Sequence, residues 1–185
     1  MQISKETLKA LINLTHAASS DETRSHLCAI HIKDGRATAT DGHIMAWHIN
    51  EELKGIECSI EVDTLLKFKK APWLLFNLSS NTCFDGTMTA PIGAFHSSID
   101  TITKAYGTAY DEKLEHGVSP EGKPLTQHLV HTKIGLNPWL LERVARALGV
   151  PKHKGFRLVI KDHTAPIQIH SFDDGFRAVI MPMRV

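Results

Sequence analysis

The chain has 185 residues, with a formal net charge of +1, 42% hydrophobic residues and 22% charged residues. A chain of this length can bury one sizeable core, and its composition excludes a largely disordered protein or a polycation. No stretch approaches the roughly 20 apolar residues that span a bilayer, and the first residues lack the basic-then-apolar layout of a secretory signal. We therefore expect a cytoplasmic protein without a membrane partner.

The cysteines and histidines show no pattern of a metal centre. Cys28, Cys58 and Cys83 form no CxxC pair, and an odd number of cysteines suits a reducing cytoplasm. The 12 histidines are scattered, without an HExxH motif or another ligand spacing. There is also no GxSxG motif, P-loop or paired-carboxylate helix. We expect no metal site, no cofactor and no enzymatic activity.

The first predicted unit is a helix followed by three strands. Residues 4–20 show the apolar periodicity of an amphipathic helix, and Ser4 stands at the position of its N-cap. Two Asp-Gly turns separate the alternating apolar runs that follow, which is the strongest short hairpin signal. We expect the strands at residues 27–32, 36–40 and 44–49.

The second predicted unit repeats this pattern after a leading strand at residues 58–62. A short helix over residues 63–70 has Asp63 as its expected N-cap, and Pro72 limits how far the helix extends. Its strands are expected at residues 73–78, 82–84 and 92–99. From about residue 101 to 128, glycines and prolines fall among polar residues, and this composition predicts a long connector.

The third predicted unit begins with a strand at residues 131–136. Asn137 is then the expected N-cap of a helix, with Pro138 as the first helical residue and Gly149 at its end. Its strands are expected at residues 156–160, 165–169 and 176–183. An Asp-Gly pair falls at the second turn of all three units, which supports an internal repeat; the glycines are Gly42, Gly86 and Gly175.

Antiparallel strands with one helix per unit must bury one face of their sheet beneath the helices. The sequence therefore predicts an α+β fold made of repeated helix-plus-antiparallel-strands units, with the helices on one face of the sheets. This arrangement excludes a doubly wound parallel sheet.

Two short strings, together with the pattern between them, resemble the bacterial DNA polymerase III beta subunit, the sliding clamp, in a shortened form of a phage or plasmid type. The strings are Ala39-Thr40-Asp41-Gly42-His43 and Met181-Pro182-Met183-Arg184. The resemblance implies a DNA-clamp fold with one complete clamp-like domain over residues 1–127 and a clamp-like half-domain over residues 128–185. In this family the two strings line the walls of one protein-binding cleft.

The resemblance assigns a peptide cleft to both strings. Methionines suit such a site, because their flexible side chains adapt to different apolar anchors. The sequence departs from the family in one respect, because Ile44 stands where the family usually has an arginine. The expected cleft residues are Leu27, Thr40, Gly42, His43, Ile44, Met45, Val179, Ile180, Met181, Pro182, Met183, Arg184 and Val185.

The resemblance also implies that helices face duplex DNA. Contacts from such helices would go to phosphates, so binding would be weak, salt-sensitive and independent of sequence. The plainer interpretation is that these basic residues complement helix dipoles and solvate the surface. The expected DNA-binding residues are Lys5, Lys9, Arg24, His26, Lys67, Lys69, Lys70, Arg143, Arg146 and Lys152.

Two functions remain open from the sequence. The first is a replication processivity factor that forms a homo-oligomeric ring, binds double-stranded DNA, and holds a DNA polymerase and a clamp loader through their clamp-binding peptides. The second is an adaptor or decoy that binds such peptides without encircling DNA.

Overall fold

The computed structural model describes residues 1–109, 135–151, 154–160, 165–171 and 176–182, with the side chains of residues 104–109 left aside. The expected strand at 131–136 and the expected domain division at 127–128 lie almost wholly outside the described residues. The same holds for Lys152, Met183, Arg184 and Val185.

Three units follow one another along the chain, as the sequence predicts. The first contains β1 (Gln2–Ser4), α1 (Lys5–Leu14), η1 (Thr15–Ala17), η2 (Glu22–Leu27), β2 (Ala29–Lys33), β3 (Arg36–Thr40) and β4 (Ile44–Ile49). The second follows a short 3-10 turn, η3 (Glu51–Leu53), and contains β5 (Cys58–Glu61), α2 (Val62–Lys67), β6 (Trp73–Asn77), β7 (Thr82–Phe84) and β8 (Thr89–Pro91). After α3 (Ser98–Ala109), the third contains α5 (Pro138–Ala147), β9 (Phe156–Val159), β10 (Ile167–Ser171) and β11 (Phe176–Ile180).

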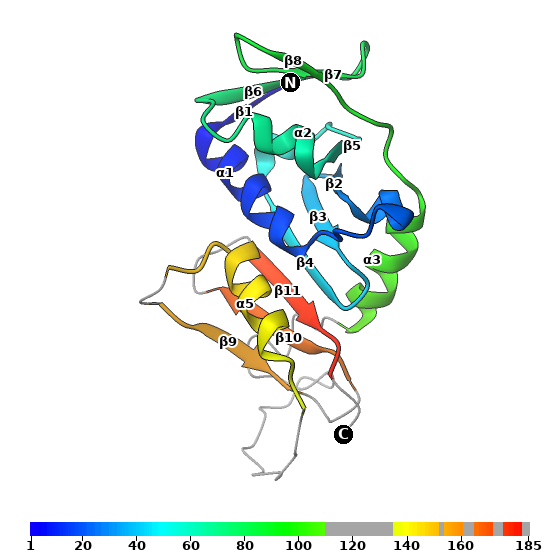
Figure 1. The fold of residues 1–185 in the computed structure, drawn as a ribbon, viewed down its shortest axis with the longest axis vertical. Helices are drawn as coiled ribbons and strands as arrows, with labels where there is room; N and C mark the ends of the chain where they lie inside the picture. Colours follow the sequence, from blue (N-terminus) through cyan, green and yellow to red (C-terminus); the bar gives the residue numbers. More distant parts are fainter. Residues whose placement is uncertain (110–134, 152–153, 161–164, 172–175, 183–185) are drawn as a thin grey trace.

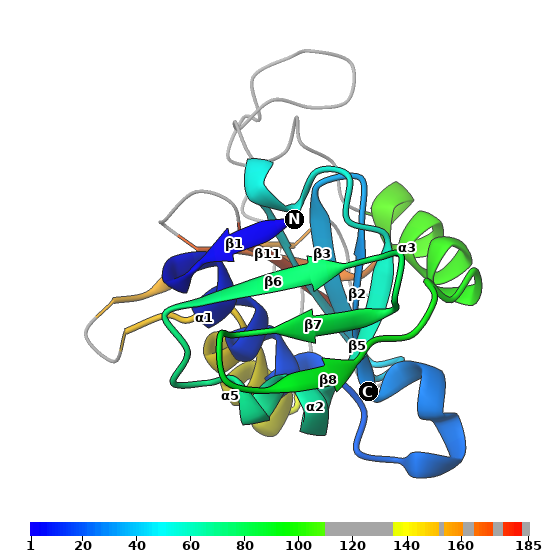
Figure 2. The same cartoon turned by 90° about the horizontal axis from the view of Figure 1, so that it is seen from above.

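All described strand pairs are antiparallel, and they form two sheets. The smaller sheet has the order β1-β6-β7-β8, and the larger has the order β5-β2-β3-β4-β11-β10-β9. The first two units exchange strands, because β1 pairs with β6 of the second unit and β5 pairs with β2 of the first. The third unit joins the larger sheet through β11, which pairs with β4. Figure 2 shows the smaller sheet face-on, with its four strands side by side.

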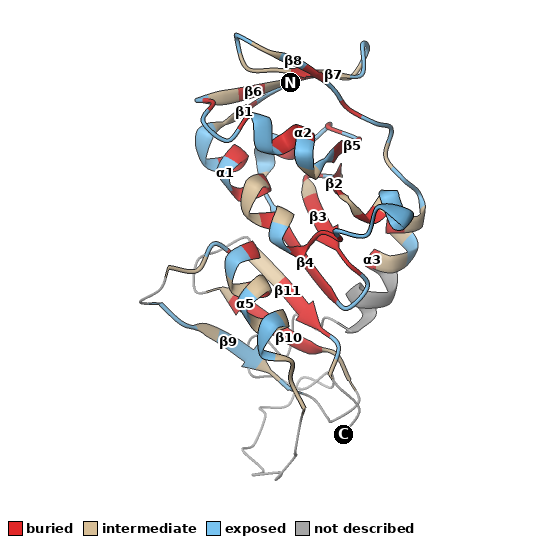
Figure 3. Cartoon of the chain, viewed as in Figure 1, coloured by how far each residue is buried: buried red, intermediate tan, exposed pale blue. Residues whose placement is uncertain are grey.

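Helices α1, α2 and α5 lie in one layer against the sheets, whereas α3 lies on the opposite side of the larger sheet (Figures 1 and 2). The main core fills the space beneath that helix layer, where Leu8, Leu11 and Leu14 of α1 are buried (Figure 3). The predicted α+β architecture of repeated helix-plus-strands units is confirmed. The additional helix on the other face, α3, was not expected.

Side-chain caps mark the beginnings of α1 and α5. The Ser4 hydroxyl accepts a hydrogen bond from the backbone N–H of Thr7, as predicted for an N-cap. Asn137 caps α5 by accepting from the N–H of Trp139, and Pro138 is the first helical residue. At α2 the prediction of an Asp63 cap is wrong, because the helix starts one residue earlier and its cap residue, Glu61, makes no side-chain cap bond.

Several predicted boundaries are wrong for local reasons. The helix expected over residues 4–20 ends at Leu14, where the chain tightens into η1 and Ala18 becomes extended. The helix expected to reach residue 70 ends at Lys67. The strand expected at 92–99 lies instead at Thr89–Pro91. The connector expected from about residue 101 is helical at its start, because α3 runs from Ser98 to Ala109. Its buried residues Ile99 and Thr103 are four residues apart, which is a helical spacing.

Strand boundaries in the third unit also shift. The strand expected at 165–169 is β10, Ile167–Ser171, and the strand expected to run to residue 183 ends at Ile180. β1, Gln2–Ser4, was not expected at all. The other described strands lie within one or two residues of their expected positions, which is the usual uncertainty of element ends.

Candidate functional site

The candidate site lies where the first and third units meet, at the pairing of β4 with β11. In this antiparallel pair Met45 stands opposite Val179 and Ile44 stands opposite Ile180. One more backbone hydrogen bond continues the pairing beyond β11, from the N–H of Met181 to the carbonyl oxygen of His43, at 3.0 Å. The two strings that the sequence singled out therefore lie side by side, as Figure 1 shows for β4 and β11.

Side-chain hydrogen bonds hold the turn between β3 and β4. One carboxylate oxygen of Asp41 accepts from the N–H groups of His43 (2.7 Å) and Ile44 (2.9 Å). The Thr40 hydroxyl donates to the carbonyl of Ile44 (2.7 Å) and accepts from the N–H of Gly42 (3.1 Å). Gly42 has a φ of +92°, a backbone conformation that disfavours any side chain. The Thr-Asp-Gly-His string thus builds a defined turn with Gly42 and His43 exposed.

A salt bridge and two hydrogen bonds connect the third unit's helix to this turn. Arg143 of α5 pairs with the second carboxylate oxygen of Asp41, whose side chain is nearly buried. The same guanidinium donates to the carbonyl oxygens of His16 and Ala18, both at 3.0 Å. Three acceptors from the first unit therefore hold a single side chain of the third unit. A planar guanidinium with several donors suits such a site better than a lysine would.

Arg24 approaches the same turn from η2. Its Nε donates to Asp21 at 3.0 Å, and one of its terminal nitrogens donates to the carbonyl oxygen of Asp41 at 3.4 Å. Arg24 and Arg143, both expected to contact DNA, thus have protein partners at the joint.

The apolar residues of the joint divide between two faces of the sheet. Ile44 and Ile180 belong to the main core under the helices. Met45, Trp47 and Val179 form a separate small cluster on the other face, against which Ile102 of α3 packs. Because strand side chains alternate between faces, this division follows directly from the sequence of the two strands.

Of the ten predicted cleft residues that the structure describes, six lie beneath the surface. Exposed or half-buried positions at the joint are Gly42, His43, Met181 and Pro182, and the side chain of Met181 is 39% exposed. The buried ones are Leu27, Thr40, Ile44, Met45, Val179 and Ile180. The assignment of these residues to a peptide cleft stays a prediction; the structure brings both predicted walls together and covers their apolar pair with Ile102.

The predicted DNA-binding residues fall into two groups. Lys5 and Lys9 of α1 are exposed one helical turn apart. Lys67, Lys69 and Lys70 are exposed around the end of α2, where the buried Phe68 anchors the chain. Among the ion pairs that the described residues form, none involves these five lysines.

The other basic residues already have neighbours. Arg146 pairs with Glu142 one turn earlier on α5, and the ring of His26 stacks on His96 with centroids 5.1 Å apart. Burial lowers the pKa of His16, as do the charges of Arg146 and Arg143 nearby. The positive charge available to a ligand on the helix layer is therefore chiefly that of the lysines on α1 and at the end of α2.

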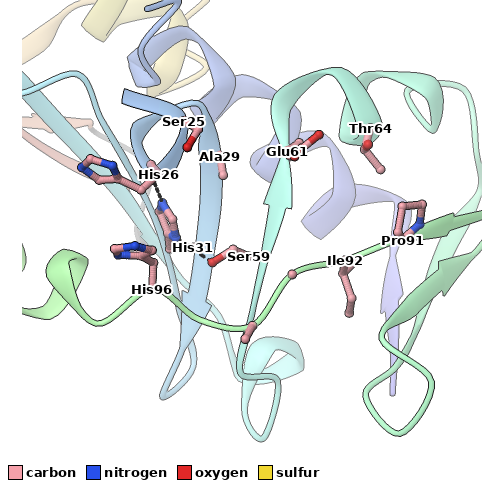
Figure 4. Close-up of a pocket in the computed structure, with 12 residues that line it drawn as sticks. Ser25, His26, Ala29, His31, Ser59, Glu61, Thr64, Pro91, Ile92 and His96 are labelled. Carbon is pink, nitrogen blue, oxygen red and sulfur yellow. Dashed lines mark hydrogen bonds between the residues drawn. The ribbon is translucent and has the colours of Figure 1, made fainter. Parts of the chain in front are cut away.

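A pocket of about 400 Å³ that the sequence did not indicate lies between η2, β2, β5 and the segment after β8 (Figure 4). Its most buried titratable group is His31, whose ring nitrogens meet the Ser59 hydroxyl at 2.8 Å and the His26 carbonyl oxygen at 2.7 Å. Burial lowers the pKa of His31 to about 4, so the ring is neutral near pH 7. With both nitrogens occupied, His31 has a structural role.

Metal binding and thiol chemistry have little support in the described part of the chain. No group of three or more His, Cys, Asp or Glu side chains there could hold a metal ion. Burial raises the pKa of Cys58 to about 12 and that of Cys83 to about 11, so both thiols stay protonated and unreactive. None of the described helices has the length and apolar character needed to cross a membrane.

The fold matches that of bacterial DNA polymerase III beta sliding clamps. Similar structures include the clamp of Pseudomonas aeruginosa with a ligand (TM-score 0.67, 16% identity), that of Bartonella birtlesii bound to griselimycin (0.68, 20%) and that of C. crescentus (0.65, 20%). Each match covers 100% of this chain and 66% of the clamp, so the chain spans just under two thirds of the length of these proteins. No family model and no curated protein matches the sequence. The chain thus has the sliding-clamp fold over the part of these clamps that it spans.

The contacts of Arg143 predict its effect on stability. Replacing it by alanine leaves the Asp41 carboxylate nearly buried without its cation, and we expect unfolding to become easier by about 2 kcal/mol. The Arg146→Ala control removes an exposed pair on the same helix and should cost at most about 0.5 kcal/mol. Urea unfolding measures both. Equal effects of the two substitutions would contradict the role of Arg143 at the joint.

Burial of His31 predicts a pH dependence of stability. Because the folded-state pKa is lowered to about 4, the unfolded chain binds this proton more readily, and stability falls as pH drops from about 6.5 towards 4. Between pH 7 and pH 5 this histidine should account for about 2 kcal/mol of lost unfolding free energy. In the His31→Gln variant that part of the loss should vanish, and a pH profile unchanged from the native protein would refute the assignment.

Proposed function

We propose that the chain is a non-enzymatic, sliding-clamp-like replication factor that binds duplex DNA without sequence preference and tethers a DNA polymerase through a peptide site at the joint of β4 and β11. The observation that carries this proposal is the joint itself. The chain covers just under two thirds of a clamp, yet it includes both strands that the resemblance assigns to the peptide cleft, and they are paired. The similar structures named above are beta clamps, which supports the same class of role.

The DNA side of the proposal rests on the helix layer. Lys5 and Lys9 of α1 are exposed, as are Lys67 at the end of α2 and Lys69 and Lys70 just after it. The two helices lie together on one side of the sheets (Figure 1). A surface of this kind attracts phosphates by charge and reads no bases, which suits a protein that slides. A net charge of only +1 means that this attraction comes from a local surface and not from the whole molecule.

The peptide part of the proposal is supported by an exposed rim, His43 and Met181, and by the buried apolar pair of Met45 and Val179. His43 and Met181 are exposed, and they follow the pairing of Met45 with Val179 along the two strands. Ile102 covers that pair from α3. An apolar anchor of a partner peptide would therefore enter by taking the place of Ile102, while the rim of His43 and Met181 contacts the rest of the peptide.

The second candidate function is an adaptor or decoy that binds the same peptides but does not encircle DNA. The joint supports it equally, because peptide binding needs no ring. Retention on DNA separates the two: a closed ring stays on circular DNA and slides off once the DNA is linearised, whereas a decoy is retained on neither.

The lysines at the end of α2 give a test of DNA binding. The combined change Lys67→Glu, Lys69→Glu and Lys70→Glu should weaken binding to duplex DNA at low salt at least tenfold. The slope of log affinity against log salt concentration should become shallower by about two to three, since about that many phosphate contacts are lost. Fluorescence anisotropy with a labelled duplex measures both. Lys54→Glu, directly after η3 and outside the helix layer, is the control and should change little. Unaltered affinity in the triple variant would remove α2 from the DNA-facing surface.

Met181 gives a test of the peptide site. Met181→Asp places a charge on the exposed rim, so we expect the affinity for a clamp-binding peptide to fall at least tenfold. Ile49→Asp, at the far end of β4 and 56% exposed, is the matched control. Isothermal titration calorimetry measures both, with circular dichroism to verify folding. If Met181→Asp binds as tightly as the control, the peptide site lies elsewhere.

A further inference from the structure

The most exposed large apolar side chain in the described part of the chain is that of Trp139, in the first turn of α5. Its exposed fraction is 71%, whereas Trp47 is buried at 6%. None of the ring or cation–π contacts that the described residues form involves Trp139. A single exposed apolar residue is common on protein surfaces, so the surroundings of the ring decide what it can do.

Trp139 lines an open groove of about 560 Å³ between α5 and η1. Arg143 and Arg146 lie on the same face of α5, because they follow the tryptophan by four and seven residues, and Glu142 lines the groove with them. The opposite wall consists of Thr15, His16, Ala18 and Ser20. A volume of this size lies within the range of about 300–1,000 Å³ that is typical of ligand sites. The groove thus combines a free aromatic ring with two arginines.

The electrostatic potential inside the groove favours a negative charge. Burial lowers the pKa of His16, and the positive charges of Arg146 and Arg143 lower it further. Arg143 is held by Asp41, but the side chain of Arg146 is 60% exposed and pairs with Glu142 of its own helix. An exposed pair of this kind is weak. A phosphate group can therefore replace Glu142 as the partner of Arg146.

A flat ring beside an exposed guanidinium matches the two parts of an unpaired nucleotide. Every base has a flat π face and can stack on an indole, so stacking tolerates any sequence. The phosphate of the same strand can meet Arg146, as a charge-assisted hydrogen bond requires. In a duplex each base is stacked between its neighbours and does not reach a protein ring. The groove is therefore suited to single strands rather than to duplexes.

The position of the groove in the helix layer fits a bound DNA strand. Gly149, at the end of α5, packs against the side chain of Asn13 of α1, and Lys9 of α1 lies near the same glycine. The layer therefore leads from Trp139 past Arg146 to the lysines of α1, on one side of the sheets (Figure 1). A DNA molecule on this layer can contact the ring with an unpaired segment and the lysines with its backbone.

We propose that the groove between α5 and η1 binds single-stranded DNA, with one base stacked on Trp139 and a phosphate at Arg146. Binding is independent of base sequence and weakens as salt is added. This site goes beyond the proposed function, which assigns duplex DNA to the lysines of α1 and α2 and a peptide to the joint of β4 and β11.

Substitutions at the ring test the proposal on the whole chain. The probe is a labelled oligothymidylate, and fluorescence anisotropy at low salt measures its affinity. Trp139→Ala should weaken binding about tenfold, whereas Trp139→Phe, which keeps a ring, should stay within about threefold of the native protein. Leu66→Ala removes an exposed apolar side chain from α2 of the same layer and should have no effect.

Two further measurements separate stacking from general attraction by charge. Arg146→Ala should make the slope of log affinity against log salt concentration shallower by about 0.7, the value for one phosphate contact on a single strand. Trp139→Ala should leave the affinity for a labelled duplex nearly unchanged, because paired bases do not reach the ring. The triple lysine variant tests duplex binding separately, so failure of this site and failure of the proposed function are distinguishable.

Three results would overturn the proposal. The first is a native protein that does not bind oligothymidylate at low salt, as expected if the groove takes a protein partner instead. The second is undiminished affinity in a Trp139→Ala variant that circular dichroism shows to be folded. The third is an equal loss of affinity for single strand and duplex in that variant, because the ring would then act without stacking on a base.

Discussion

The structure depends on one joint, in which β4 of the first unit pairs with β11 of the third. This pairing makes the larger sheet continuous over seven strands and attaches the last unit to the first. Backbone pairing fixes the register, and the guanidinium of Arg143 fixes the helix layer above it by binding Asp41 and two carbonyl groups of the first unit. Without this joint the third unit would lose its only described strand partner outside itself.

The turn residue Asp41 links the chemistry of this joint to its surface. One oxygen of its carboxylate shapes the turn that presents His43, and the other holds Arg143. The same side chain therefore sets the exposed rim of the candidate peptide site and the attachment of α5. Asp41, in what the sequence presents as a simple hairpin turn, thus shapes the turn and holds Arg143. A change at Asp41 would therefore alter both the exposed rim and the attachment of α5.

Local sequence patterns predicted the parts of the fold that local physics determines. Asp-Gly turns and alternating residues located β3 and β4, and the Asn137-Pro138 pair located the start of α5. The partnership of β4 with β11 came from resemblance alone, because periodicity carries no information on which distant strands pair. Helix α3 was missed because the apolar spacing of Ile99 and Ile102 lies beside a segment rich in turn formers. The contacts of Arg143 with Asp41 were not expected, because a basic residue on a helix has the same sequence pattern whether it faces solvent or a nearly buried carboxylate.

The three units differ in how the edges of their strands are paired. The first two units cover each other's edges, whereas the third leaves β9 open within the described chain.

The footprint of a clamp-binding peptide, mapped by amide hydrogen exchange on the whole chain, tests the central claim most directly. The account predicts slower exchange in residues 42–47 and 176–182, which form the joint, together with faster exchange in residues 98–103 as Ile102 is displaced. Protection confined to the pocket around His31, or no change at the joint while the peptide is bound, would contradict it.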